Sequence, residues 1–139
     1  MMRRNIQKLR VVLFILTVCL LFLCVKVYQS TMDYKVETRQ TLELEAKIEA
    51  LLKKHPDKTT LVQFVQNNDI IYSAIRISDA LKYDDPYPYP DAPPEAYWVV
   101  GIIAMGPIHF GKNYTVYFNK NGKFLTYKSY ELVSPGLDF

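Results

Sequence analysis

The strongest hydrophobic signal in the chain is an apolar run close to its amino end. Residues 11–25 include no charged side chain, and the run extends to Tyr28 if the long side chain of Lys26 carries its ammonium group to the membrane surface. Its length then approaches the ~20 residues that an α-helix needs to cross a bilayer. The pattern predicts a membrane anchor in contact with lipid over residues 11–28, between a tail of residues 1–10 and a domain of residues 29–139.

The residues that flank this run indicate that it is retained. Residues 26–33 contain no pair of small residues of the kind at which a signal peptide is cleaved, and neither Cys19 nor Cys24 follows a small residue, as lipoprotein processing requires. Four cations precede the run: Arg3, Arg4, Lys8 and Arg10. Because positive charge is retained on the cytoplasmic side, we expect a single-pass protein with its amino end in the cytoplasm and its domain outside.

Two amphipathic helices are predicted after the anchor. Residues 31–54 carry an apolar stripe of barely two turns, which favours a helix packed on its own domain over a coiled coil of three or four heptads. Pro56 ends this helix, and Asp57 or Thr59 can cap the next one. The second helix should end near Asn67 and Asn68, since asparagine can adopt the left-handed conformation that terminates a helix.

Four later segments have the composition of strands. They are Ile70–Ile77, Tyr97–Met105, Tyr114–Phe118 and Lys123–Val133, and the last two flank a turn at Asn119–Gly122. The nearly continuous apolar run of the second segment is typical of a central strand that is buried on both faces. The fold class predicted is α+β: a transmembrane helix, then two helices that cover one face of a small antiparallel meander sheet of about four strands.

Charge excludes one class of partner. The net charge is +3, but residues 29–139 hold 12 Lys and Arg against 14 Asp and Glu, because the basic residues gather around the anchor. The domain therefore lacks the basic surface of a nucleic-acid-binding protein, and no nucleic-acid partner is expected.

No arrangement of residues with a recognised chemistry is visible. Both cysteines lie in the anchor, and the two histidines, His55 and His109, lack further ligands that would complete a metal site. No serine lies between glycines as in a nucleophile elbow, and no calcium-binding loop surrounds Asp84 and Asp85. We therefore predict no catalytic, cofactor-binding or metal-binding residue. The alternative is a small enzyme or ligand-binding domain whose site forms only through tertiary contacts.

Residues 78–96 differ from the rest of the chain in composition. They contain five of the eight prolines, which excludes regular helix and central strand, and the alternation of proline with tyrosine favours an extended polyproline II path. Five acids against one lysine leave a net charge of −4, so the expected partner has a basic surface. The predicted partner-binding residues are Tyr83, Asp84, Asp85, Tyr87, Tyr89 and Trp98. The alternative is a crossover loop whose tyrosines pack on the sheet.

The sequence from Tyr117 to Tyr127, Tyr-Phe-Asn-Lys-Asn-Gly-Lys-Phe-Leu-Thr-Tyr, resembles the closing hairpin of many small bacterial envelope domains, including those similar to the lipoprotein of outer-membrane assembly. The resemblance covers this hairpin alone, defines no family and transfers no functional residue. The anchor, its predicted topology and the absence of a catalytic motif favour a non-catalytic protein-interaction domain on the periplasmic side of the inner (cytoplasmic) membrane. An envelope assembly factor, a complex subunit and an immunity-type protein all fit this description.

Overall fold

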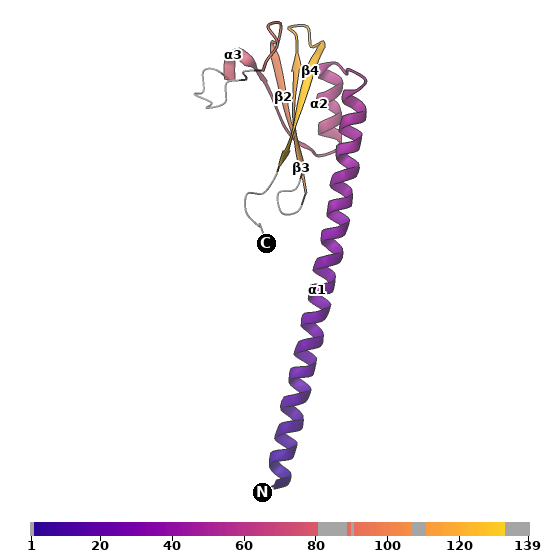
Figure 1. Cartoon of the computed structure of the whole chain (residues 1–139), viewed down its shortest axis with the longest axis vertical. Coiled ribbons are helices and arrows are strands. Elements are labelled where there is room, and N and C mark those ends of the chain that lie inside the picture. The colour runs from indigo at the N-terminus through magenta and orange to yellow at the C-terminus, as the bar shows by residue number, and fades with distance from the viewer. Residues whose placement is uncertain (1, 81–88, 90, 107–110, 133–139) are drawn as a thin grey trace. The chain divides into compact units, whose positions relative to one another are not determined.

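A computed structural model describes residues 2–80, 89, 91–106 and 111–132 of the chain. Its elements, in chain order, are α1 (Met2–Leu52), α2 (Lys58–Asn67), β1 (Ile71–Arg76), α3 (Ile77–Ala80), β2 (Trp98–Met105), β3 (Gly111–Phe118) and β4 (Phe124–Leu132) (Figure 1). The four strands form one antiparallel sheet in the order β1-β2-β3-β4. The predicted α+β class and the antiparallel meander are confirmed.

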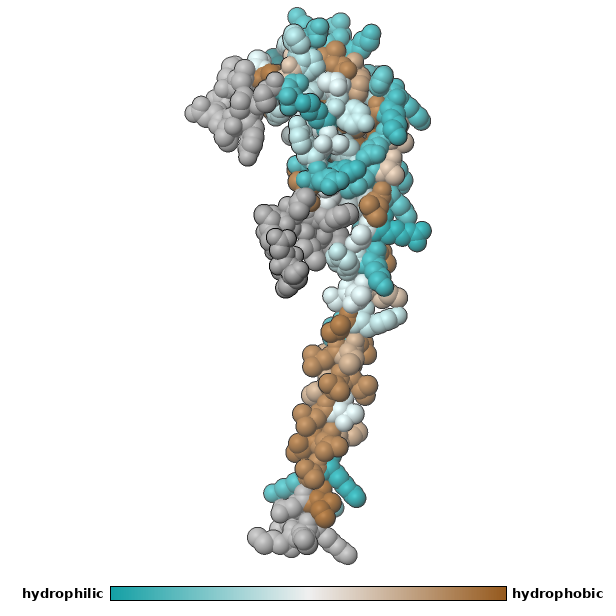
Figure 2. Space-filling model, viewed as in Figure 1, coloured by the Kyte–Doolittle hydropathy of each residue, from teal (hydrophilic) through white to brown (hydrophobic). Residues whose placement is uncertain are grey.

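Helix α1 is 51 residues long and includes both the predicted anchor and the first predicted helix of the domain. The sequence predicted two helices here, and the structure has one, because residues 29 and 30 are neither proline nor glycine and nothing interrupts the backbone hydrogen bonds. Near its amino end α1 has a stretch long and apolar enough to cross a membrane, with exposed side chains that form the hydrophobic region in Figure 2. The chain divides into two compact units between Glu37 and Thr38, and the second unit contains the sheet.

The core of the second unit lies between the sheet and the helices α1 and α2 (Figure 1). On β2 and β3 every second side chain faces this core, as the alternation of a strand requires. The buried core side chains are Ile48, Leu52, Leu61, Val65, Ile70, Val100, Ile102, Ala104, Tyr114, Val116 and Phe118. Each of the larger ones contributes roughly 1.5–3 kcal/mol by leaving water.

Strand β2 lies inside the sheet, as predicted, with Ile102 opposite Tyr72 of β1 and Tyr114 of β3. The prediction that both of its faces are buried is correct only in part. On the face away from α1 and α2, Val99 is buried, but Ile103 is only half-buried and Met105 is 47% exposed. The reason is that α1 and α2, the helices that pack against the core, lie on the other side of the sheet.

The connection between α1 and α2 follows the predicted signals. The Oδ1 atom of Asp57 accepts a hydrogen bond from the backbone N–H of Thr60 at 2.7 Å, which caps the amino end of α2 and lowers the pKa of the Asp57 carboxyl. At the carboxyl end of α2, the prediction that an asparagine adopts the left-handed conformation is wrong. The φ of Asn68 is −107°, and Asp69 is the residue with a positive φ. The Asn68 side chain instead donates to the carbonyl oxygen of Phe64 at 2.8 Å.

The hairpin between β3 and β4 turns at Asn119–Gly122, as predicted, and Gly122 has a φ of +77°. The carbonyl oxygen of Gly122 also accepts from the backbone N–H of Lys58 at 2.9 Å, so the turn is joined to the start of α2. A register shift next to Phe118 changes the alternation on β4, and both Phe124 and Tyr127 can then pack against the core.

Two further differences from the sequence prediction are larger than a residue or two. Residues 77–80 form the short helix α3, although the segment from Ser78 was expected to contain no regular helix; the first proline is Pro86, so nothing prevents one helical turn before it. Strand β3 begins at Gly111 rather than Tyr114, because its first residues pair with the end of β4.

Candidate functional site

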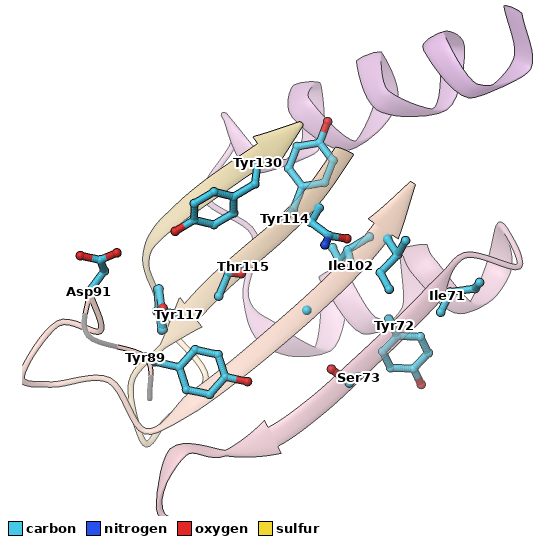
Figure 3. A pocket seen from close by; sticks show the side chains of 13 residues that line it. Ile71, Tyr72, Ser73, Tyr89, Asp91, Ile102, Tyr114, Thr115, Tyr117 and Tyr130 are labelled. Atoms are coloured by element: carbon cyan, nitrogen blue, oxygen red, sulfur yellow. The ribbon is translucent and has the colours of Figure 1, made fainter. Parts of the chain in front are cut away.

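The face of the sheet opposite α1 and α2 carries a groove of about 620 Å³, within the range of about 300–1,000 Å³ that is usual for ligand sites (Figure 3). Residues of all four strands line it, together with two residues of the segment before β2. The lining residues are Ile71, Tyr72, Ser73, Tyr89, Asp91, Gly101, Ile102, Ile103, Asn113, Tyr114, Thr115, Tyr117 and Tyr130.

The groove is hollow because its floor is built from small residues. Ser73, Gly101 and Thr115 lie opposite one another on β1, β2 and β3. Gly101 has no side chain, and a Cβ atom at this position would lie 3.1 Å from the Oγ of Ser73. The rows of side chains on either side are bulkier: Ile71, Ile103, Asn113 and Tyr130 on one side, and Ile75, Val99, Tyr117 and Thr126 on the other.

Tyrosine rings form much of the wall of the groove (Figure 3). The rings of Tyr89 and Tyr117 meet edge to face, with centroids 6.3 Å apart and 86° between their planes. Burial raises the pKa of the Tyr117 phenol above its ordinary value, so the hydroxyl is a hydrogen-bond donor over the whole neutral pH range. Tyr130 is 52% exposed and presents its ring to solvent. Such a wall offers apolar area together with hydroxyl groups that can donate and accept hydrogen bonds.

Charge on this face is confined to one ion pair among the strand residues and the lining residues that the structure describes. The Nζ of Lys128 lies 2.7 Å from the Oδ2 of Asp91, so the carboxylate that lines the groove is paired. Asn113 adds a polar group, because its Oδ1 is buried and has no hydrogen-bond partner among the described residues. The groove therefore suits an uncharged, partly apolar occupant that can donate a hydrogen bond.

The structure separates the two predicted partner-binding residues that it describes. Tyr89 lines the groove and packs on Tyr117, whereas Trp98 belongs to the helix side of the sheet. There the Nζ of Lys58 lies 4.0 Å from the centre of the Trp98 ring, and the guanidinium carbon of Arg76 lies 5.6 Å from it. The remaining predicted residues, Tyr83, Asp84, Asp85 and Tyr87, lie outside the described residues, as does His109. His55 stacks on Phe124 at 4.7 Å.

Most of the groove was missed by sequence reasoning, although a signal for it exists. On β3, Asn113, Thr115 and Tyr117 alternate with core residues, and on β4, Thr126, Lys128 and Tyr130 repeat the pattern. A period of two with polar or tyrosine residues predicts a strand face that is not covered by helices. The position of Gly101 within the apolar run of β2 marked the same face.

A second polar cluster lies on the helix side of the sheet. The Nζ of Lys112 lies 2.9 Å from the Oε1 of Glu49, and the Tyr114 hydroxyl donates to the same oxygen at 3.3 Å. The hydrogen bond from Lys112 lowers the pKa of Glu49 and raises the pKa of Lys112. Burial, together with the nearby charge of Glu49, raises the pKa of Tyr114. These contacts join α1 to β3.

Glu45, one turn earlier on α1, is 7% exposed, and its Oε1 has no hydrogen-bond partner among the described residues. Burial raises the pKa of this carboxyl; the charges of Glu49 and Glu131 act in the same direction, and Lys112 offsets part of the effect. The cluster holds no histidine or cysteine. Within the described part of the chain, no group of three or more His, Cys, Asp or Glu is placed to bind a metal.

Comparisons with protein-family models, with curated proteins and with solved structures return no match. The function is therefore inferred from the fold and from the residues that line the groove.

Proposed function

We propose that the chain is a single-pass membrane protein whose outward domain binds a partner protein in the groove, without catalysis. The observation that carries the proposal is a groove of about 620 Å³ on a sheet face that the described helices leave uncovered, with walls of tyrosine. Tyrosine is enriched in recognition surfaces, because its rigid ring gives a large contact area at a low entropic cost.

The residues in the groove favour binding over chemistry. Ser73 and Thr115 supply hydroxyl groups, but the described lining contains no histidine, cysteine or lysine that could activate them. The carboxylate of Asp91 is engaged by Lys128. A hydrolytic site needs a nucleophile and a base within hydrogen-bond reach, and the described lining does not provide that pair.

The exposed apolar side chains at the amino end of α1 support a lipid-embedded anchor, since about fifteen to twenty such residues in water would be strongly unfavourable. The cations before residue 11 favour a cytoplasmic amino end in the inner membrane of a bacterial envelope. The groove would then face the periplasm, where an assembly factor, a complex subunit or an immunity-type protein would meet its partner.

Two measurements test the proposal in cells. Alkaline phosphatase fused after Phe139 should be active, because the proposed topology places the carboxyl end outside. A photo-crosslinking amino acid at Tyr130, which lines the groove, should give a defined adduct with one protein. The same amino acid at the exposed Gln63 of α2 is the matched control and should give none.

Specificity for the groove is checked by combining the crosslinker at Tyr130 with Gly101→Val, which fills the floor. Loss of the adduct with unchanged protein abundance supports the proposal. An inactive phosphatase fusion, or equal adducts from Tyr130 and Gln63, would show that the groove is not an outward-facing binding site.

A further inference from the structure

We infer that the outer edge of strand β1 is a further binding surface, at which an extended segment of a partner protein joins the sheet as an added strand. This inference goes beyond the proposed function and does not require an occupant in the groove. It rests on the direction of the backbone groups of β1, on their exposure and on the difference between the two edges of the sheet.

The pairing of β1 with β2 shows which backbone groups of β1 point outward. The N–H of Ile77 donates to the carbonyl oxygen of Tyr97, one step beyond the register pair of Arg76 with Trp98. In an antiparallel ladder this bond makes Arg76 and Trp98 a pair without hydrogen bonds between them, and such pairs alternate with hydrogen-bonded pairs. Every second residue of β1, counted back from Arg76, therefore directs its N–H and C=O away from β2.

The residues concerned within the strand are Ala74 and Tyr72, and no turn or loop in the described part of the chain pairs with their outward backbone groups. Ser73 and Ala74 are exposed, and Ile71 is 59% exposed at this edge of the sheet (Figure 3). Donors and acceptors on alternate residues are completed by another extended backbone, whereas a helix has already paired its own groups. The occupant is therefore a strand, without proline opposite Tyr72 or Ala74.

The two edges of the sheet, β1 and β4, differ in protection against such pairing. Natural edge strands are protected by lysine, by bulges or by a segment that lies against them. Strand β4 has Lys128, which binds Asp91 of the segment before β2, and a register shift near its start. Strand β1 pairs without interruption over residues 71–76, contains no proline, glycine or lysine, and has its one charged residue, Arg76, at its end. The edge suited to strand addition is therefore β1.

The side chains of β1 restrict the composition of the added strand. Ile71 and Ile75 lie on the groove side of β1, with Ser73 between them. Cross-strand pairs are most favourable between β-branched or aromatic residues and between small hydroxyl residues. The occupant should therefore have a β-branched or aromatic residue opposite each isoleucine and a serine or threonine opposite Ser73.

A second copy of this chain fits the edge less well than a different protein. Two β1 strands related by a two-fold axis would pair antiparallel, with the axis perpendicular to the joined sheet. Residues 38–52 of α1 pack along the sheet, so these helices would run in opposite directions in the two copies. Both copies are proposed to be anchored in the same membrane, which favours helices that enter the two domains in the same direction.

The test uses the full-length protein in detergent micelles and the peptide Lys-Thr-Ile-Thr-Thr-Thr-Ile-Thr-Lys, in which the isoleucines can lie opposite Ile75 and Ile71. Hydrogen exchange with NMR detection reports on single amides. In the free protein, the amides of Tyr72 and Ala74 should exchange rapidly, and those of Ser73 and Ile75, which belong to the ladder with β2, slowly. The bound peptide should slow exchange at Tyr72 and Ala74 by about tenfold or more.

Two methylated peptides test whether the backbone carries the binding. Methylation of the backbone nitrogens of the fourth and sixth residues removes the N–H groups that face β1, and it should weaken binding by about tenfold or more in fluorescence anisotropy. Methylation of the fifth and seventh residues affects N–H groups that face away from β1. That control peptide should bind within about threefold of the parent.

Proline variants of the protein locate the edge. Ala74→Pro removes an outward N–H, which an edge strand tolerates because no ladder bond is lost, and it should abolish peptide binding. Ser129→Pro is the matched control, since the register directs the backbone of the exposed Ser129 outward from β4, and it should leave binding unchanged. Melting temperatures establish that the variants are folded, and the methylated peptides decide the matter if Ala74→Pro unfolds.

Slow exchange at Tyr72 and Ala74 without peptide would overturn the inference, because the edge would already be covered. Analytical ultracentrifugation then shows whether a second copy or the chain itself covers it. Equal binding of the two methylated peptides, or no binding of the parent peptide, would also overturn it. Loss of the adduct at Tyr130 in cells while the peptide still binds would contradict the proposed groove function alone, and the opposite result would contradict this inference alone.

Discussion

The carboxylate of Asp91 lies 2.7 Å from the Nζ of Lys128, and this contact joins the segment before β2 to the last strand of the sheet. Both side chains are close to half exposed, so the pair should contribute less than about 1 kcal/mol to the free energy of unfolding. The main effect of the ion pair is to fix the position of the segment before β2. The pair holds the segment that carries Tyr89 against the groove, next to the backbone hydrogen bond from the N–H of Ala92 to the carbonyl oxygen of Tyr89.

Asp91→Asn should therefore loosen the segment without unfolding the domain. We expect the melting temperature to fall by less than about 5 °C. The amide of Ala92 should exchange with solvent faster, as measured by hydrogen exchange with NMR detection. Glu43→Gln, which breaks the exposed pair with Arg39 on α1, is the control and should leave exchange at Ala92 unchanged. Unaltered exchange at Ala92 in Asp91→Asn would show that the ion pair does not hold the segment.

Ile102 and Ile103 are neighbours on β2 that face opposite sides of the sheet. Ile102 is 1% exposed in the core, whereas Ile103 is half-buried beside the groove. Ile102→Ala should cost about 2–5 kcal/mol through loss of burial and the cavity left behind, and Ile103→Ala about 1 kcal/mol. Urea unfolding of the two variants measures the difference. Equal losses would mean that the groove face is covered as fully as the core face. Ile102→Asp, which buries an unpaired charge, should prevent folding.

Gly111 and Gly101 allow a second comparison between two positions in the sheet. A Cβ atom at position 111 would lie 1.9 Å from the carbonyl oxygen of Ala104 on the paired strand, and this backbone cannot move without breaking the ladder. Gly111→Ala should therefore destabilise the domain by more than about 2 kcal/mol. Gly101→Ala meets only the Oγ of the exposed Ser73, which can rotate, and should change stability by about 0.5 kcal/mol or less. Thermal unfolding followed by circular dichroism distinguishes the two, and a stable Gly111→Ala protein would contradict the pairing of β2 with β3.

Glu45 and Glu49 should give opposite pH dependences. The pKa of Glu49 lies below its ordinary value of 4.5 in the folded chain, so its contribution to stability is present above pH 4.5 and is lost as the pH falls through the lowered value. The pKa of Glu45 lies above 4.5, so its charged form opposes folding at neutral pH, and this cost disappears as the pH falls through the raised value toward 4.5. Together they favour greatest stability near pH 4.5.

Single substitutions separate these two contributions. At pH 7.5, Glu45→Gln should raise the melting temperature by a few degrees, and the gain should shrink as the pH approaches 4.5. Glu49→Gln should lower stability at pH 7.5 by about 1 kcal/mol, because the partly exposed Lys112 loses its partner, and the loss should shrink as the pH falls below 4.5 through the lowered pKa of Glu49. Melting curves between pH 4 and 8 measure both. A Glu45→Gln protein that is less stable than the parent at every pH would show that the carboxyl is paired.

Local signals determined the boundaries of most elements. Pro56 and the capping side chain of Asp57 separate α1 from α2, and Asn119–Gly122 makes the turn before β4. These signals act within a few residues through the backbone, so they can be read from the sequence. The continuous α1 was missed because a change from apolar to polar side chains does not itself end a helix, and the hydrophobic pattern alone suggested a boundary there.

The groove depended on tertiary structure. By itself the sequence determined that a long apolar helix precedes an α+β domain, and that Tyr89 lies in a segment unsuited to regular structure. Only strand register placed Ser73, Gly101 and Thr115 in one row, and only side-chain packing brought Tyr89 onto Tyr117. The register between consecutive strands is set by the best burial of the whole core, so a hollow on the opposite face has no local signature.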